Sequence, residues 1–110
     1  MNHINKEVAF RYLAGIEHLF DTLAKSFLES YKDFNQNCQT AYESNDYELL
    51  HNHVHSLKGI TLNIGMEELY NECVVVLTDI RSGFIDSYKI KKLQDVFSNT
   101  YEELKVMVTS

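Results

Sequence analysis

Hydrophobic residues recur every three or four positions along most of this chain, and polar residues fill the positions between them. The longest run starts at Ile16 and continues with Phe20, Leu23, Phe27, Tyr31, Phe34, Cys38 and Ala41. Spacings of three and four place side chains on one face of an α-helix. The pattern therefore predicts one long helix over residues 16–43, about 40 Å in length.

Four further segments carry the same spacing, and short polar stretches separate them. They predict helices over residues of about 5–14, 46–64, 66–82 and 87–108. Asn5 is placed to cap the first helix, and Asp86 or Ser87 is placed to cap the last. Asn45, with a glutamate three residues later, fits a variant of the capping box. Gly65 suits the left-handed conformation that ends many helices.

The composition favours long helices packed into a single domain. The chain contains no proline and only four glycines, so the strongest helix breakers are nearly absent. Its 110 residues, 45% hydrophobic and 24% charged, are typical of one globular domain. Short connections make neighbouring helices antiparallel. The expected fold is all-α: an antiparallel four-helix bundle over residues 1–110, with a short additional N-terminal helix.

Charge and hydropathy exclude several classes of partner. A net charge of −6 argues against nucleic acid, because no basic stripe exists to neutralise phosphates. The longest apolar block, residues 73–77, is far too short to span a membrane. Cys38 and Cys73 lack CxxC spacing, and the first residues lack the apolar run of a signal peptide. We therefore expect a cytoplasmic monomer that binds neither nucleic acid nor membrane.

The third predicted helix combines features that a purely structural helix would avoid. Gly59 lies within it, where glycine costs roughly 1 kcal/mol relative to alanine. At about 100° per residue, one side gathers Leu50, Leu57 and Ile64, flanked by Leu49, Ile60 and Thr61. The opposite face, within roughly 60° of His55, gathers His51, Asn52, Lys58, Gly59 and Leu62.

This second face predicts a docking site centred on an accessible histidine that handles a negative group. Lys58 can neutralise an anion on His55, and Gly59 lets a partner's backbone approach closely. Leu62 supplies an apolar contact beside them. His53 falls on another side of the helix, towards the core boundary, and is expected to lie outside the site.

The string His55-Ser56-Leu57-Lys58-Gly59 resembles the H-x-x-K-G core of histidine-containing phosphotransfer (HPt) domains in multistep phosphorelays. The similarity extends without a gap over residues 27–69 and includes Phe27, Ala41, Asp46, Gly65 and Leu69. The resemblance implies that His55 is phosphorylated, that Lys58 stabilises or orients the phosphoryl group, and that Gly59 gives a receiver domain room to dock.

Two departures from the family pattern are present, and neither touches the phosphoryl-accepting chemistry. Ile60 and Leu62 stand where small residues are common, and Leu62 lies on the docking face. Val76 and Leu77 stand where an acid is often found late in the next helix. Because Leu62 lies on the docking face, we expect the partner preference to differ from that of typical members.

The resemblance implies a phosphorelay intermediate. It would accept a phosphoryl group on His55 from a receiver-domain aspartate and pass it to another receiver. Its partners would be response-regulator receiver domains, with a hybrid sensor histidine kinase as a further candidate. The chain would need no cofactor of its own, since Mg²⁺ belongs to the receiver. It would not be an ATP-dependent kinase, because no phosphate-binding glycine loop is present.

Four alternatives remain open from the sequence. His51 and His55 could chelate a metal, although no third ligand is evident on their face. The bundle could be an interaction module without phosphotransfer. The phosphoacceptor half of a sensor kinase fits less well, because Ser56 replaces an acid and proline is absent. The chain could also be a phosphotransfer domain cut from a hybrid or chemotaxis-type kinase. The partners, the signal and the direction of phosphate flow stay open.

Overall fold

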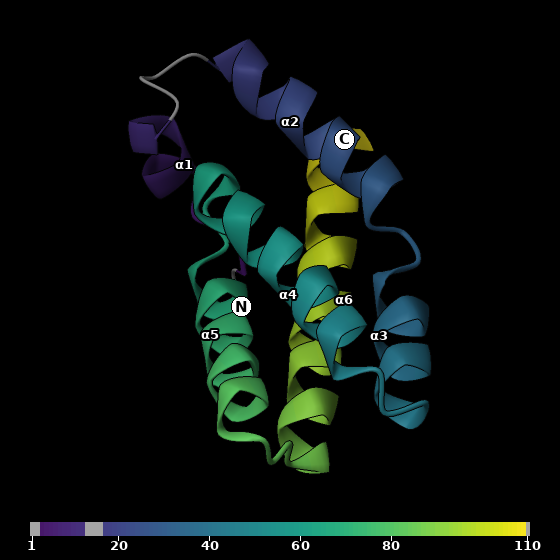
Figure 1. The fold of residues 1–110 in the computed structure, drawn as a ribbon. Helices are drawn as coiled ribbons and strands as arrows, with labels where there is room; N and C mark the ends of the chain where they lie inside the picture. Colours follow the sequence, from purple (N-terminus) through teal and green to yellow (C-terminus); the bar gives the residue numbers. More distant parts are fainter. Residues whose placement is uncertain (1–2, 13–16, 110) are drawn as a thin grey trace.

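The computed structural model describes residues 3–12 and 17–109, and all regular structure in these ranges is helical (Figure 1). The elements are α1 (Lys6–Tyr12), α2 (Glu17–Ser30), α3 (Phe34–Glu43), α4 (Tyr47–Thr61), the 3₁₀ turn η1 (Leu62–Ile64), α5 (Glu67–Ser82) and α6 (Ser87–Thr109). No strand occurs in the described ranges. The prediction of an all-α fold is confirmed.

Most predicted helix ends agree with the structure. The Asn5 side chain accepts hydrogen bonds from the backbone N–H groups of Glu7 and Val8, at 3.0 and 3.2 Å, and so caps α1. Gly65 ends the α4–η1 segment in a left-handed conformation with φ +73°. Asp86 accepts from the N–H of Tyr88 at the start of α6. The predicted end of the first helix near 14 and the start of the second at 16 lie outside the described residues.

The prediction of one helix over 16–43 is wrong, because a turn at residues 31–33 separates α2 from α3. Asp33, with φ −105° and ψ 15°, stands outside the helical region just before α3. The start of α3 is held against α6 by hydrogen bonds. The Asn35 side-chain Nδ2 donates one to the Gln94 carbonyl and one to Ser98 Oγ. Spacing alone does not reveal the break, because the hydrophobic positions keep their intervals across it.

The start of α4 also differs by one residue from the prediction. The capping side chain is that of Asp46, whose Oδ1 accepts from the N–H of Leu49 at 3.1 Å. Asn45 instead adopts a left-handed conformation, with φ 57°, in the turn after α3. Asparagine tolerates this conformation better than most residues. It therefore belongs to the end of one helix rather than to the beginning of the next.

The helices pack so that α4 has neighbours on two sides. Figure 1 shows α5 and α6 side by side and running in opposite directions, with α4 against α5 and α3. Helix α2 contacts α6, and α1 lies against η1 at the far end of α4. The core holds large apolar side chains from these elements, among them Phe20, Phe27, Leu50, Leu57, Leu69, Leu77, Leu93 and Leu104. Among the described helices, none is long and apolar enough to cross a membrane.

Candidate functional site

One face of the α4–η1 segment is anchored in the core. Leu50, Val54, Leu57 and Ile64 are completely buried, at 0% exposure. Thr61 is buried with them, and its hydroxyl donates to the Lys58 carbonyl at 2.8 Å, so this polar group is satisfied. Burial of these side chains fixes the rotation of α4 about its own axis. The opposite face must therefore point to solvent.

The residues at the edge of the buried face differ from those that the sequence predicted. Leu49, expected to flank the core, is 42% exposed, so that expectation is wrong. Val54, which the helical projection did not assign to the core, is buried. The shift follows from the neighbouring helices, which cover the Val54 side of α4 more completely than the Leu49 side.

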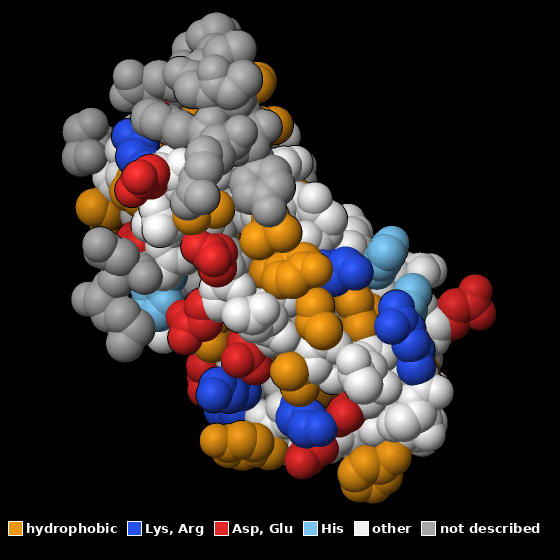
Figure 2. Space-filling view, turned by 90° about the vertical axis from the view of Figure 1, so that its left-hand side faces the viewer, with side chains coloured by type: hydrophobic (Ala, Val, Ile, Leu, Met, Phe, Trp, Pro, Cys, Tyr) orange, Lys and Arg blue, Asp and Glu red, His pale blue; other side chains and the backbone are white. Residues whose placement is uncertain are grey.

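All six residues predicted for the site lie on the outward side of the α4–η1 segment. Asn52, His55 and Gly59 are exposed, while His51, Lys58 and Leu62 are half-buried. We call this set of six residues the His55 face. Figure 2 views the side on which α1 and α5 lie; at its right-hand edge two histidine side chains stand beside Lys or Arg side chains, with hydrophobic groups next to them.

His51 and His55 form a stacked pair on this face. Their ring centroids are 5.6 Å apart and their planes differ by 11°. The spacing of four residues already places them on neighbouring turns, but the parallel orientation of the rings is visible only in the structure. Among the described residues, no group of three or more His, Cys, Asp or Glu side chains is arranged to hold a metal ion.

Gly59 has open space where a side chain would stand. A Cβ atom built at this position meets nothing within 4 Å outside its own helix and its neighbours in the chain. Its conformation is not left-handed, unlike that of Gly65 and Gly83. Neither packing inside the protein nor backbone geometry therefore requires a glycine at 59.

Lys58 lies beside His55 and close to α5. Within the described part of the chain its ammonium group forms no ion pair. Burial raises the pKa of Cys73 on α5 to about 12, with smaller contributions from Cys38 and Glu72, while the positive charge of Lys58 lowers that pKa. The Lys58 charge therefore acts across the contact between the two helices, and it is not neutralised there by a carboxylate.

His53 lies apart from this group, as expected. It lines a polar hollow of about 250 Å³ between α4 and the α2–α3 turn, together with Ser30, Tyr31, Phe34, Asn37 and Ser56. The hydroxyl groups of Tyr31 and Ser56 are 2.7 Å apart in its wall. Sequence reasoning missed this contact, because it depends on the break that brings Tyr31 to α4.

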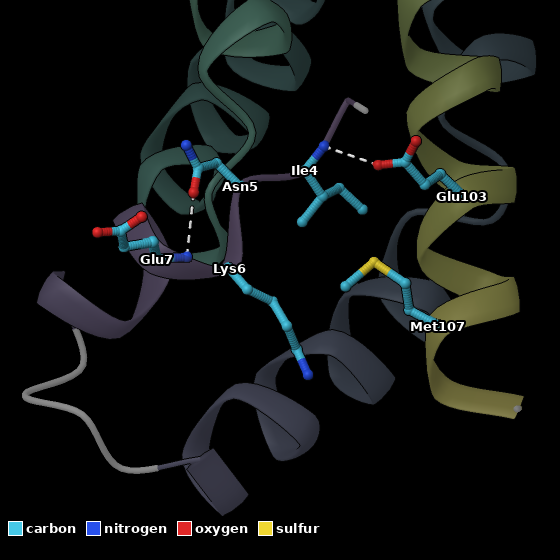
Figure 3. A pocket seen from close by; sticks show the side chains of 6 residues that line it. All are labelled: Ile4, Asn5, Lys6, Glu7, Glu103 and Met107. Carbon is cyan, nitrogen blue, oxygen red and sulfur yellow. Dashed lines mark hydrogen bonds between the residues drawn. The ribbon is translucent and has the colours of Figure 1, made fainter. Parts of the chain in front are cut away.

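A larger hollow of about 620 Å³ lies near the N-terminal end of the described chain (Figure 3). Its walls are formed by residues 4–7 and by Glu103 and Met107 of α6. The Glu103 carboxylate accepts from the backbone N–H groups of His3 and Ile4, each at 2.8 Å. These bonds attach the N-terminal segment to α6, and none of the residues of the His55 face contributes to the walls.

Comparisons of this chain with family models, curated proteins and solved structures give no match. A function is therefore inferred from the geometry of the His55 face and from the resemblance of residues 55–59 to a known phosphotransfer motif. Three geometric features bear on it: an exposed imidazole in the middle of a fixed helix, a neighbouring cation, and a glycine with open space above it.

Proposed function

We propose that this protein is a phosphorelay intermediate that carries a phosphoryl group on His55. In this proposal α2 with α3, α4, α5 and α6 form the antiparallel four-helix bundle of an HPt domain, and α1 is the additional short helix. The observation that carries the proposal is the exposure of His55 in the middle of α4, directly opposite a completely buried face. A rigidly held, accessible nucleophile is what in-line phosphoryl transfer requires.

In the forward step, an unprotonated ring nitrogen of His55 attacks the phosphorus of a receiver's aspartyl phosphate. A nitrogen–phosphorus bond forms as the acyl phosphorus–oxygen bond breaks. The aspartate leaves as a carboxylate with the bonding electron pair. The reverse step returns the phosphoryl group to an aspartate of the same or another receiver, so the same residues serve both directions. The receiver's Mg²⁺ would help neutralise the transferring phosphoryl group.

The neighbours of His55 fit this chemistry. Lys58 offers an ammonium group without an ion-pair partner in the described part of the chain, so it is free to interact with phosphoryl oxygens. Gly59 leaves space for a receiver's backbone, while Leu62 and Asn52 provide an apolar and a polar contact at the rim. We further propose that the protein is a cytoplasmic monomer and that it has no ATP-dependent kinase activity of its own.

The test uses the full chain and a panel of receiver domains from its own organism, each carrying a labelled aspartyl phosphate. We expect at least one receiver to label the wild type and the control His53→Gln, which removes a histidine outside the His55 face. His55→Gln should lose essentially all label. If His55→Gln takes up as much label as wild type, or if no receiver labels the wild type, the proposal is wrong.

A further inference from the structure

The stacked partner of His55 is itself titratable, and it occupies a specific place on the helix. His51, His55 and Lys58 fall on three successive turns of α4. His51 and Lys58 are seven residues apart, so they project about 20° from each other on the same flank of His55. One cationic or potentially cationic group therefore stands on each side of the acceptor ring along the helix.

We propose that His51 is a positioning residue whose protonated form holds the phosphoryl group on His55 and prolongs its lifetime. This inference rests on the proposed function. The His51 ring lies parallel to the His55 imidazole, with ring centroids 5.6 Å apart. When His51 carries a proton, a phosphoryl group on His55 lies between two positive charges rather than beside one.

The other charged groups near His51 are few. Glu48 lies one turn before it on α4, and Arg81 is in the last turn of α5, which runs antiparallel to α4. Asp79, also near this end of α5, is bound to Lys89 of α6. On α3, the only charged residue is Glu43 at its end, and η1 carries none. On α4 itself, His53 is two residues from His51 and lines the hollow beside the α2–α3 turn.

The effect on lifetime has a physical cause. Hydrolysis of phosphohistidine is fastest when the ring is protonated, because the imidazole then leaves as a neutral group. A second cation beside the ring opposes that protonation and stabilises the phosphoryl dianion. For charges about 6 Å apart near a surface, screened by salt, we expect the lifetime to increase about threefold to tenfold.

The test loads the full-length protein with phosphoramidate, which needs no receiver. The phosphorus–nitrogen bond of phosphoramidate breaks, ammonia leaves, and the new bond forms to His55. The lifetime of phosphohistidine is then measured at about pH 6 and about pH 8 in wild type, His51→Gln, His51→Lys and the control His53→Gln.

At about pH 6, the phosphohistidine of wild type should have a lifetime about threefold to tenfold longer than that of His51→Gln. At about pH 8, the two lifetimes should be equal. In His51→Lys, the lifetime of phosphohistidine should exceed that of His51→Gln at both pH values, because lysine keeps its charge. The control His53→Gln should have the same lifetimes as wild type. The inference would be overturned if the ratio of the wild-type lifetime to the His51→Gln lifetime were the same at the two pH values. It would also be overturned by label on His51 or by the absence of label on His55. Labelling by phosphoramidate without labelling by any receiver would contradict the proposed function alone.

Discussion

The backbone N–H of Asn5 donates a 2.8 Å hydrogen bond to the carbonyl oxygen of Gly65. This bond joins the residue that caps α1 to the turn that follows η1. Gly65 has φ +73°, and the carbonyl group of Asn5 occupies the space that a Cβ atom at 65 would need. Glycine is therefore required here for two separate reasons, its backbone conformation and its contact with Asn5.

Substitution of Gly65 tests both requirements. Gly65→Ala should lower the free energy of unfolding by more than about 2 kcal/mol, because the left-handed conformation costs roughly 1–2 kcal/mol and the methyl group overlaps Asn5. The matched control is Gly83→Ala, where φ is +81° but nothing lies within 4 Å of the added atom. The free energy of unfolding of Gly83→Ala, measured by urea denaturation, should fall by only about 1 kcal/mol. Equal losses would show that the contact with Asn5 adds nothing.

Gly59 should behave in the opposite way, because it lies in a right-handed helix with open space around it. Gly59→Ala should raise the free energy of unfolding by about 0.5–1 kcal/mol, since alanine is the better helix former. Gly59→Gln should reduce the rate of labelling by a phosphorylated receiver by at least about tenfold, equivalent to about 1.4 kcal/mol.

Labelling by phosphoramidate provides the control for these Gly59 variants. It requires no close approach of a protein surface, so both variants should match wild type in this reaction. If Gly59→Gln is labelled by receivers at the wild-type rate, Gly59 does not provide clearance for a partner.

Lys58 should matter for transfer and little for stability. Its ammonium group has no ion pair within the described chain, so Lys58→Ala should change the free energy of unfolding by less than about 0.5 kcal/mol. The initial rate of labelling by a phosphorylated receiver should fall about tenfold, because a charge-assisted hydrogen bond to the phosphoryl group is lost. Lys58→Arg should retain most of the rate.

Lys92→Ala removes the same charge from an exposed position on α6 and serves as the control for net charge. It should label at the wild-type rate. A comparable loss in Lys92→Ala and Lys58→Ala would mean that overall charge, rather than the position beside His55, governs the encounter.

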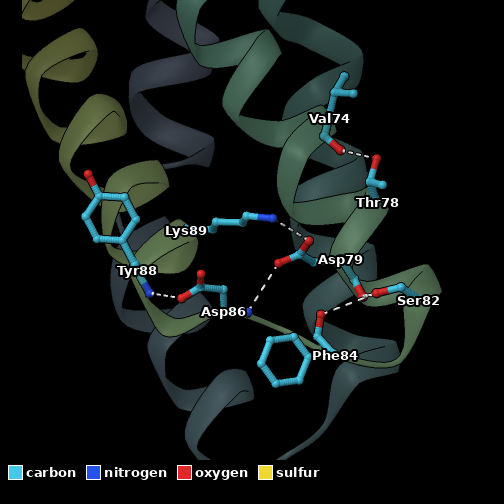
Figure 4. Close-up of polar contacts among 8 residues, drawn as sticks. All are labelled: Val74, Thr78, Asp79, Ser82, Phe84, Asp86, Tyr88 and Lys89. Carbon is cyan, nitrogen blue, oxygen red and sulfur yellow. Dashed lines mark hydrogen bonds and ion pairs between the residues drawn. The ribbon is translucent and has the colours of Figure 1, made fainter.

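A buried carboxylate at the α5–α6 connection should make stability depend on pH (Figure 4). Asp79 is 8% exposed, and it accepts from Lys89 Nζ at 2.9 Å and from the Asp86 N–H at 3.2 Å. The hydrogen bond from Lys89, followed by that from Asp86, lowers the pKa of Asp79. A lowered pKa contributes stability above the ordinary carboxyl range, and this contribution is lost as the pH falls through the folded-state pKa.

Asp79→Asn should therefore lower the urea midpoint at about pH 7 and have little effect at about pH 2. Asp95→Asn is the matched control, because its partner Lys91 and its own carboxylate are both exposed to solvent, and it should change the midpoint little at either pH. If Asp79→Asn lowers the urea midpoint by the same amount at about pH 2 as at about pH 7, the charge of Asp79 does not stabilise the fold.

The sequence by itself determined which segments are helical and which way α4 faces. Gly65 and Gly83 end helices because glycine readily adopts a left-handed conformation, and Asn5 caps α1 through its own neighbouring N–H groups. These are interactions between residues close in sequence. The periodicity of hydrophobic residues likewise separates Leu57 from His55, because burial of one face exposes the other.

The tertiary structure alone decided where the predicted long helix breaks and how the site is arranged. The start of α3 is held by bonds from Asn35 to α6, and Tyr31 reaches Ser56 on α4. These partners are distant in sequence, so no local pattern reports them. The same holds for the exposure of Leu49, which depends on how closely the neighbouring helices cover α4. Spacing fixes the face on which a side chain stands, whereas packing between helices fixes its neighbours and its orientation.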